Sequence, residues 1–219
     1  MVQEITKKFS QNIRQFGFLN ALRLMLRYRF DYLWMCQVHD VLFLQKLMEK
    51  PEEVKKQLKA IQVHSSNSSD VEKVLGRELH SNEVIFIACE DNEVTGYAIS
   101  QRGGRYRLPG NFDIDLPNHA ILWKNLYVDP AHRGKRIGLI LNYARANHAT
   151  ESGLANYVFV FTENIIAKRN LYKVGFKDYG SLQCSSFLRN KRIKFKSKNF
   201  VSGNHNWLNG FIDDGKDNE

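Results

Sequence analysis

The sequence is poor in the residues that build disulfide frameworks, metal sites and long linkers. Three of its 219 residues are cysteine and four are proline, and it has no Gly/Ser-rich tract. Cys36, Cys89 and Cys184 are scattered, odd in number and without CxxC spacing, which argues against a disulfide framework. The seven histidines show no metal-ligand spacing, so no metal is expected. These absences favour a globular protein in a reducing compartment.

Long apolar runs are missing as well. Charged residues interrupt the apolar stretches, and none of these is long enough to span a bilayer. The first residues, with Lys7 and Lys8 among polar side chains, do not resemble a signal peptide. We therefore expect a soluble protein of the cytoplasm.

Positive charge is in excess, and apolar residues suffice for a core. The formal net charge is +9, and 43% of the residues are hydrophobic. A basic surface attracts polyanions such as coenzyme A, nucleic acid or an anionic membrane. Charge alone does not choose among these partners, and no motif points to a specific nucleic acid.

The N-terminal segment has the pattern of an amphipathic helix. Between Phe9 and Phe30, apolar residues recur at steps of three and four, which places them on one helical face. Arg14, Arg23 and Arg27 lie among them. Two interpretations stay open: a helix packed on its own domain, or an interfacial helix in peripheral contact with acidic lipid through residues 9–30. We expect a helical extension over residues 1–30, one domain over 31–200, and a disordered polar tail over 201–219.

The rest of the chain alternates between strand and helix patterns. Strands are expected at residues 32–44, 84–89, 94–101, 120–128, 157–162, 182–188 and 192–198, and helices at 52–62, 71–79, 137–150 and 164–174. The order is helices, an antiparallel hairpin with its neighbour, and then β-α-β-α-β. That order predicts an α/β fold with a mixed sheet.

One basic stretch is ambiguous. Arg102, Arg105 and Arg107 surround the pair Gly103-Gly104 and interleave with Tyr106. We expect a solvated loop here. The alternative is a stretch that touches an anionic ligand.

The most informative motif runs from Val128 to Gly138, VDPAHRGKRIG, from a strand end into a helix. A helix N-terminus offers unpaired N–H groups and a positive dipole end, and glycines let the backbone approach phosphate closely. Arg133, Lys135 and Arg136 add positive charge. The expected ligand is a pyrophosphate. Neither the Walker A pattern nor GxGxxG is present.

These residues resemble motif A of the GCN5-related N-acetyltransferases, in which V-x-P-x-x-[RQ]-G-x-G-[IV]-[GA] leads into the helix that binds the coenzyme A pyrophosphate. Arg136 stands where that family usually has a glycine. A second segment is similar to the last helix of the family: Asn164-x-x-Ala167, followed by Lys173-Val174-Gly175-Phe176. The family's tyrosine is displaced by one position, because Leu171 occupies its place and Tyr172 follows.

The resemblance implies a mostly antiparallel sheet with one splayed parallel strand pair, and direct acetyl transfer from acetyl-CoA to an amine in a ternary complex. It also implies a set of cofactor-binding residues: Leu126, Tyr127, Val128, Arg133, Gly134, Lys135, Arg136, Ile137, Gly138, Asn164 and Lys168. Tyr172 is the expected general acid, and Glu163 is the expected base. Asp113, Asp115 and His119 are further candidates for the base.

The acceptor is left open among a small amine, an amino sugar and an amino-acid-like compound. Two other interpretations are kept beside this one. The first is the same fold with a longer acyl-CoA or a hydroxyl acceptor. The second is a non-catalytic module that binds a membrane or nucleic acid through its basic surface.

Overall fold

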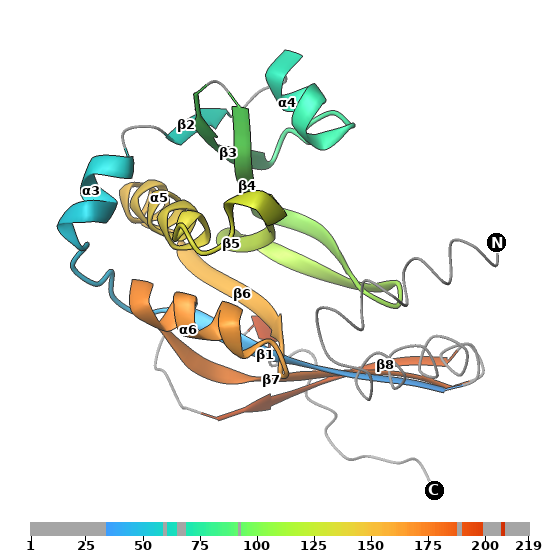
Figure 1. Ribbon diagram of the computed structural model, residues 1–219. Helices are drawn as coiled ribbons and strands as arrows, with labels where there is room; N and C mark the ends of the chain where they lie inside the picture. The colour runs from blue at the N-terminus through green and yellow to red at the C-terminus, as the bar shows by residue number, and fades with distance from the viewer. Residues whose placement is uncertain are drawn as a thin grey trace, which may run out of the picture.

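The computed structural model describes residues 34–58, 61–64, 69–91, 93–187, 190–198 and 207–208. The predicted helix at residues 9–30 lies outside this part of the chain, as does all of the predicted tail except Trp207 and Leu208. In the described part, eight strands form one mixed sheet in the order β2-β3-β4-β5-β6-β1-β7-β8, with helices against it (Figure 1). This confirms the predicted α/β fold with a mixed sheet.

The strands and helices have the following bounds. The strands are β1 Trp34–Leu44, β2 Ile61–His64, β3 Glu83–Glu90, β4 Glu93–Leu108, β5 Phe112–Val128, β6 Ala155–Phe161, β7 Phe176–Phe187 and β8 Asn190–Ser197. The helices are α3 Glu52–Leu58, α4 Ser69–Leu75, the short 3₁₀ turn η1 Pro130–His132, α5 Ile137–Ser152 and α6 Ile165–Val174.

Local sequence signals set the ends of the two helices in the β-α-β-α-β half. Helix α5 ends at Gly153, and α6 begins at Asn164, whose side chain accepts a hydrogen bond from the amide of Ala167 at 3.1 Å. Gly175 ends α6 with a φ of 118°, and a Cβ atom there would lie 1.8 Å from the carbonyl oxygen of Lys46. A side chain at position 175 is therefore excluded by both conformation and space.

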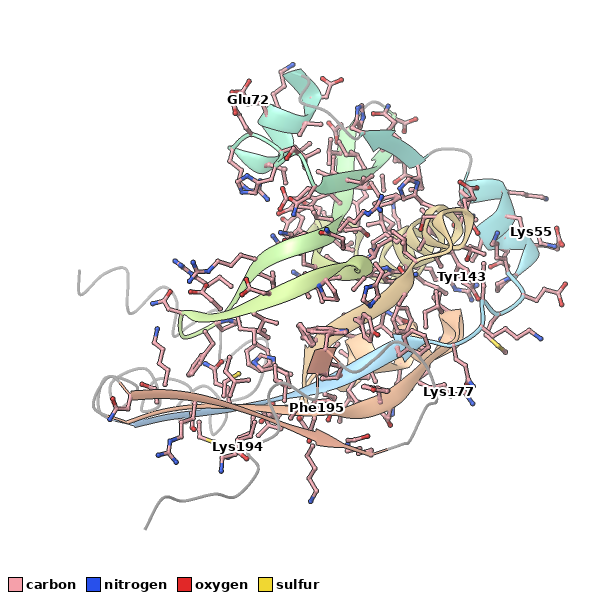
Figure 2. The ribbon with its side chains drawn as sticks, turned by 180° about the vertical axis from the view of Figure 1, so that it is seen from behind. Lys55, Glu72, Tyr143, Lys177, Lys194 and Phe195 are labelled. Carbon is pink, nitrogen blue, oxygen red and sulfur yellow. The ribbon has the colours of Figure 1, made fainter. Side chains whose placement is uncertain are left out.

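Helices cover the two faces of the sheet unequally. Helices α3, α5 and α6 pack on one face, where Trp123, Leu171 and Phe176 belong to a shared apolar cluster. Helix α4 packs on the other face, with Val71 against Ile85 and Ile99. In Figure 2, Tyr143 of α5 and Lys55 of α3 lie on one side of the molecule, and Glu72 of α4 lies on the other.

Strands β4 and β5 extend beyond the central sheet as a long hairpin that lies over β1, β7 and β8 (Figure 1). Leu108 and Ile114 of the hairpin share an apolar cluster with Leu182 of β7 and Phe195 of β8. Leu208, from the predicted tail, is fully buried in the same cluster. Burial of these side chains holds the hairpin against the neighbouring strands.

Several predicted elements have other bounds in the structure: α4 ends at Leu75, β5 begins at Phe112 and β7 begins at Phe176. The helix expected at residues 52–62 ends at Leu58, and residues 61–64 form β2 against β3. The solvated loop expected around Gly103-Gly104 is wrong, because β4 continues to Leu108 and pairs with β5 from Phe112 onward. The cause is cross-strand pairing, which stabilises a strand that its local sequence alone does not favour.

Candidate functional site

The parallel strands β5 and β6 separate at one end. They pair over four positions, from Ala120 with Ala155 to Trp123 with Val158. Beyond Trp123, β5 remains paired with β4, whereas β6 continues against β1 up to Phe161. Asn125, with a φ of 49°, coincides with an irregular register between β5 and β4. This is the splayed parallel pair that the resemblance predicts.

The loop from β5 to α5 has two residues with positive φ. The carboxylate of Asp129 accepts a hydrogen bond from the amide of Ala131 at 2.8 Å and so starts the turn η1. Gly134 has a φ of 90° and Arg136 a φ of 64°. Arg136 therefore adopts a left-handed conformation, which glycine takes without strain and which other residues rarely adopt.

The amides at the start of α5 are available to a ligand. Among the described residues, the amides of Gly134, Lys135, Arg136, Ile137 and Gly138 donate to no protein acceptor. They lie at the N-terminus of a 16-residue helix, where the aligned peptide dipoles favour a negative charge. The arrangement suits phosphate oxygens.

Basic side chains around this loop are paired, but only at the surface. Lys135 Nζ lies 2.8 Å from Glu90, and Arg136 pairs with Glu53 of α3. Both pairs are exposed, and exposed ion pairs are weakened by solvent and salt. A dianionic ligand at the loop can therefore compete for these cations at small cost.

Two side chains beside the gap are unusually exposed for apolar residues. Leu126 is 42% exposed and Tyr127 is 43% exposed. Both lie on the part of β5 that has left β6. They are placed to contact a ligand that lies along β5.

Helix α6 brings its polar residues to different partners. Lys168 Nζ lies 2.5 Å from the carboxylate of Asp40, which is buried in β1. Burial alone would raise the pKa of Asp40, but the hydrogen bond and charge of Lys168, with help from Lys198, lower it. Asp40 therefore stays ionised, and it holds the ammonium of Lys168.

Tyr172 is directed towards β7. Its hydroxyl donates a hydrogen bond to Asp178 at 2.9 Å, and burial together with that carboxylate raises the pKa of Tyr172 to about 12. Leu171, in the position where the family has its tyrosine, is 3% exposed and packs in the core. Strands β6 and β1 lie between β7 and the splayed end of β5.

The four candidate bases do not gather in one place. Asp113 lies on the hairpin, where hydrogen bonds from Arg107 and Arg105 lower its pKa to about 2. Asp115 and His119 are exposed on the same strand, β5. Glu163 is exposed between the end of β6 and the start of α6. Of these carboxylates, Glu163 follows the strand that forms one side of the gap.

A family model described as "Acetyltransferase (GNAT) family" matches residues 46–176, more than half of the chain. The chain belongs to this family. No curated protein matches the sequence. The match spans both segments that carry the sequence resemblance, the loop from Val128 to Gly138 and α6.

Solved structures resemble this chain at low sequence identity. One is described as a GNAT-family acetyltransferase from Novosphingobium aromaticivorans, with a TM-score of 0.51 and 10% identity over 69% of this chain and 63% of that one. Another is a GCN5-related N-acetyltransferase-like protein from Streptococcus suis, with a TM-score of 0.45 and 9% identity over 78% of this chain and 68% of that one. The chain thus spans less than two thirds of the first structure that it matches.

The GNAT domain also holds two polar groups that the sequence analysis missed. Glu83 of β3 is buried and forms ion pairs with Arg77 and Lys124. Arg145 of α5 is buried, and its guanidinium packs on the ring of Trp123. One signal was present in the sequence, since Lys124 interrupts the otherwise apolar strand AILWKNLYV. A charge inside a buried strand usually has a specific partner.

The described residues offer neither a metal-binding cluster nor a membrane span. Within this part of the chain, no three His, Cys, Asp or Glu side chains are grouped to hold a metal ion. The same part contains no helix with the length and apolarity to cross a bilayer.

Proposed function

We propose that this GNAT domain transfers an acetyl group from acetyl-CoA to an amine, directly and in a ternary complex. The observation that carries the proposal is the combination of the gap between β5 and β6 with the unbonded amides at the start of α5. The amides can hold a diphosphate, and the gap can hold the extended pantetheine arm that follows it. The domain that we propose spans residues 31–200.

The coenzyme would lie along β5. The amides of Gly134, Lys135, Arg136, Ile137 and Gly138 would bind the diphosphate, with the Arg133 guanidinium beside them. The pantetheine arm would follow the exposed strand past Val128, Tyr127 and Leu126. Asn164, and Lys168 with the ammonium donors that its pair with Asp40 does not use, are the proposed contacts on the other side of the gap.

The chemistry at the end of the gap is acyl transfer. The neutral amine nitrogen attacks the thioester carbonyl carbon, the C–S bond breaks, and the proton that the nitrogen loses as the amide forms goes to the departing thiolate. A main-chain N–H of β5 near Leu126 would polarise the carbonyl and stabilise the oxyanion. The attacking amine, with a pKa of ~10 in water, must first lose a proton, and we propose Glu163 as its acceptor, directly or through a water molecule.

Ligand-induced stabilisation tests this function. A ligand that binds only the folded state raises the melting temperature, by an amount set by its concentration relative to Kd. We expect acetyl-CoA to raise the melting temperature while ATP and NAD do not, and we expect thiol release in the presence of an amine. Equal stabilisation by ATP would contradict the proposal, as would the absence of any acetyl-CoA effect. A parallel titration with long-chain acyl-CoA compares acyl lengths.

A further inference from the structure

A cavity of about 490 Å³ lies against β3, β4 and β5. Its lining includes Arg77, Glu83, Arg105, Arg107, Lys124 and Asn125. It includes the arginine stretch that the sequence left as either a loop or a ligand contact. Arg105 and Arg107 therefore line the same cavity.

The cavity lies on the sheet face opposite α5. Trp123 packs beneath α5, and in a strand the next side chain points to the other face. Lys124 accordingly reaches Glu83 of β3 at 2.5 Å and Gln101 of β4 at 2.5 Å. Figure 1 shows α5 and α4 on opposite sides of β3 and β4.

The same cavity reaches the splayed strand. Asn125, part of its lining, is the residue with positive φ just beyond the last pair between β5 and β6. An acyl group brought through the gap from the α5 side would arrive at this residue. The cavity is thus placed on the side from which an acceptor would approach.

The charge of the cavity is positive. Its lining has four cations, Arg77, Arg105, Arg107 and Lys124, against one carboxylate, Glu83. Glu83 is fully buried and receives hydrogen bonds from Arg77 at 2.9 Å and 3.1 Å. Its charge is therefore satisfied within the protein.

The two hairpin arginines remain accessible. The side chains of Arg105 and Arg107 are 67% and 62% exposed, and both pair with Asp113 on the surface. Even with Asp113 counted, the cations outnumber the carboxylates four to two. Each guanidinium has five N–H donors, and its hydrogen bonds to Asp113 use at most two of them.

We propose that this cavity binds the oxyanion end, a carboxylate or a phosphate, of the acceptor amine. The inference rests on the proposed acetyl transfer and names its substrate class. Arginine holds both oxyanions bidentately. The cationic cluster also disfavours the protonated amine, because a nearby positive charge lowers an amine pKa and so favours the neutral nucleophile.

Matched amines test the proposal. The pairs are 3-aminopropyl phosphate with 3-aminopropanol, and 4-aminobutanoate with 4-aminobutanol. Binding to the protein saturated with CoA is measured by calorimetry, so that a slow turnover does not hide the answer, and thiol release gives kcat/KM where turnover occurs. We expect the anionic member of at least one pair to bind at least tenfold more tightly, and the pair that shows this distinguishes phosphate from carboxylate.

Variants connect the preference to the cavity. Arg105→Gln combined with Arg107→Gln should reduce the preference to less than threefold while acetyl-CoA still stabilises the protein. Arg102→Gln is the control, since Arg102 is exposed on the same strand but does not line the cavity. Equal binding within both pairs would overturn this inference alone, as would a preference that survives the double variant. If acetyl-CoA did not stabilise the wild-type protein, the proposed function would be overturned instead.

Discussion

The guanidinium carbon of Arg145 lies 4.5 Å from the centre of the Trp123 ring, and both side chains are buried. Burial lowers the pKa of Arg145 to about 9, which still leaves it charged near neutral pH. Its Nη1 donates to the carbonyl oxygens of Ile99 and Lys124, each at 3.4 Å. These carbonyls lie just before the irregular register at Asn125, so Arg145 ties α5 to the point where β5 leaves β6.

We expect Arg145→Met to destabilise the protein and to loosen the gap. Loss of buried hydrogen bonds leaves two carbonyls without this donor, at a cost of about 1–3 kcal/mol. Urea unfolding measures the change, and the KM for acetyl-CoA should rise in the same variant. Arg169→Met, at an exposed position of α6, is the control. Unchanged stability and unchanged KM would show that the tie is dispensable.

Arg136 is expected to tolerate glycine and to reject a β-branched residue. A left-handed φ costs an L-residue roughly 1–2 kcal/mol, and glycine avoids this cost but is more flexible when unfolded. Arg136→Gly should therefore change the free energy of unfolding by less than about 1 kcal/mol and keep acetyl-CoA binding. Arg136→Val should be less stable than Arg136→Gly by about 1–2 kcal/mol. Equal stability of the two variants would mean that position 136 does not have a positive φ.

Glu83 should make the protein sensitive to acid. Burial alone would raise the pKa of Glu83, but hydrogen bonds from Arg77, Lys124 and the His80 amide outweigh it and lower the pKa to about 2. A pKa that is lower in the folded state stabilises above the unfolded value of about 4.5 and loses this stabilisation as pH falls towards 2. At ~1.4 kcal/mol per pKa unit, the lowered pKa of this fully buried carboxylate stabilises the folded protein by about 3 kcal/mol at neutral pH.

The pH dependence of unfolding checks this expectation. Denaturant unfolding between pH 7 and pH 3 should show a steeper loss of stability for the wild type than for Glu83→Gln. Glu78→Gln, at an exposed position nearby, should follow the wild type. Parallel curves for the wild type and Glu83→Gln would contradict a strongly lowered pKa.

Tyr172→Phe tests the proton donor. The hydroxyl of Tyr172 already donates to Asp178, and its raised pKa makes it a reluctant acid. We expect Tyr172→Phe to lower kcat by less than tenfold. It should also lower the stability slightly, and Asp178→Asn should lower it by a similar amount. A general acid contributes about 10²–10⁴-fold, so a hundredfold fall in kcat with unchanged stability would assign that role to Tyr172.

Much of the fold followed from local patterns, and the exceptions have a common cause. The apolar run at residues 157–162 and the helix pattern at residues 164–174 are local signals, and β6 and α6 confirm the elements that they predict. The continuation of β4 through Gly103-Gly104 depends on its pairing with β5, which the local sequence does not show.

The site was divided in the same way. The loop from Val128 to Gly138 could be predicted because its chemistry lies in consecutive residues. The cavity draws Arg77, Glu83, Arg105 and Lys124 from three strands and a loop, and only the sheet order brings them together. Local spacing cannot predict such a cluster.

In the proposed function, main-chain amides at the start of α5 bind the diphosphate of acetyl-CoA. Gly134→Pro removes one of these amides and excludes the positive φ of the loop. Gly153→Pro is the matched control, since Gly153 also has a positive φ and, as at Gly134, a Cβ atom added there would meet no neighbour within 4 Å.

Calorimetric titration of acetyl-CoA into both folded variants is the most direct measurement. We expect Gly134→Pro to lose at least a hundredfold in affinity, while Gly153→Pro binds within threefold of the wild type. Full affinity in Gly134→Pro would contradict this expectation.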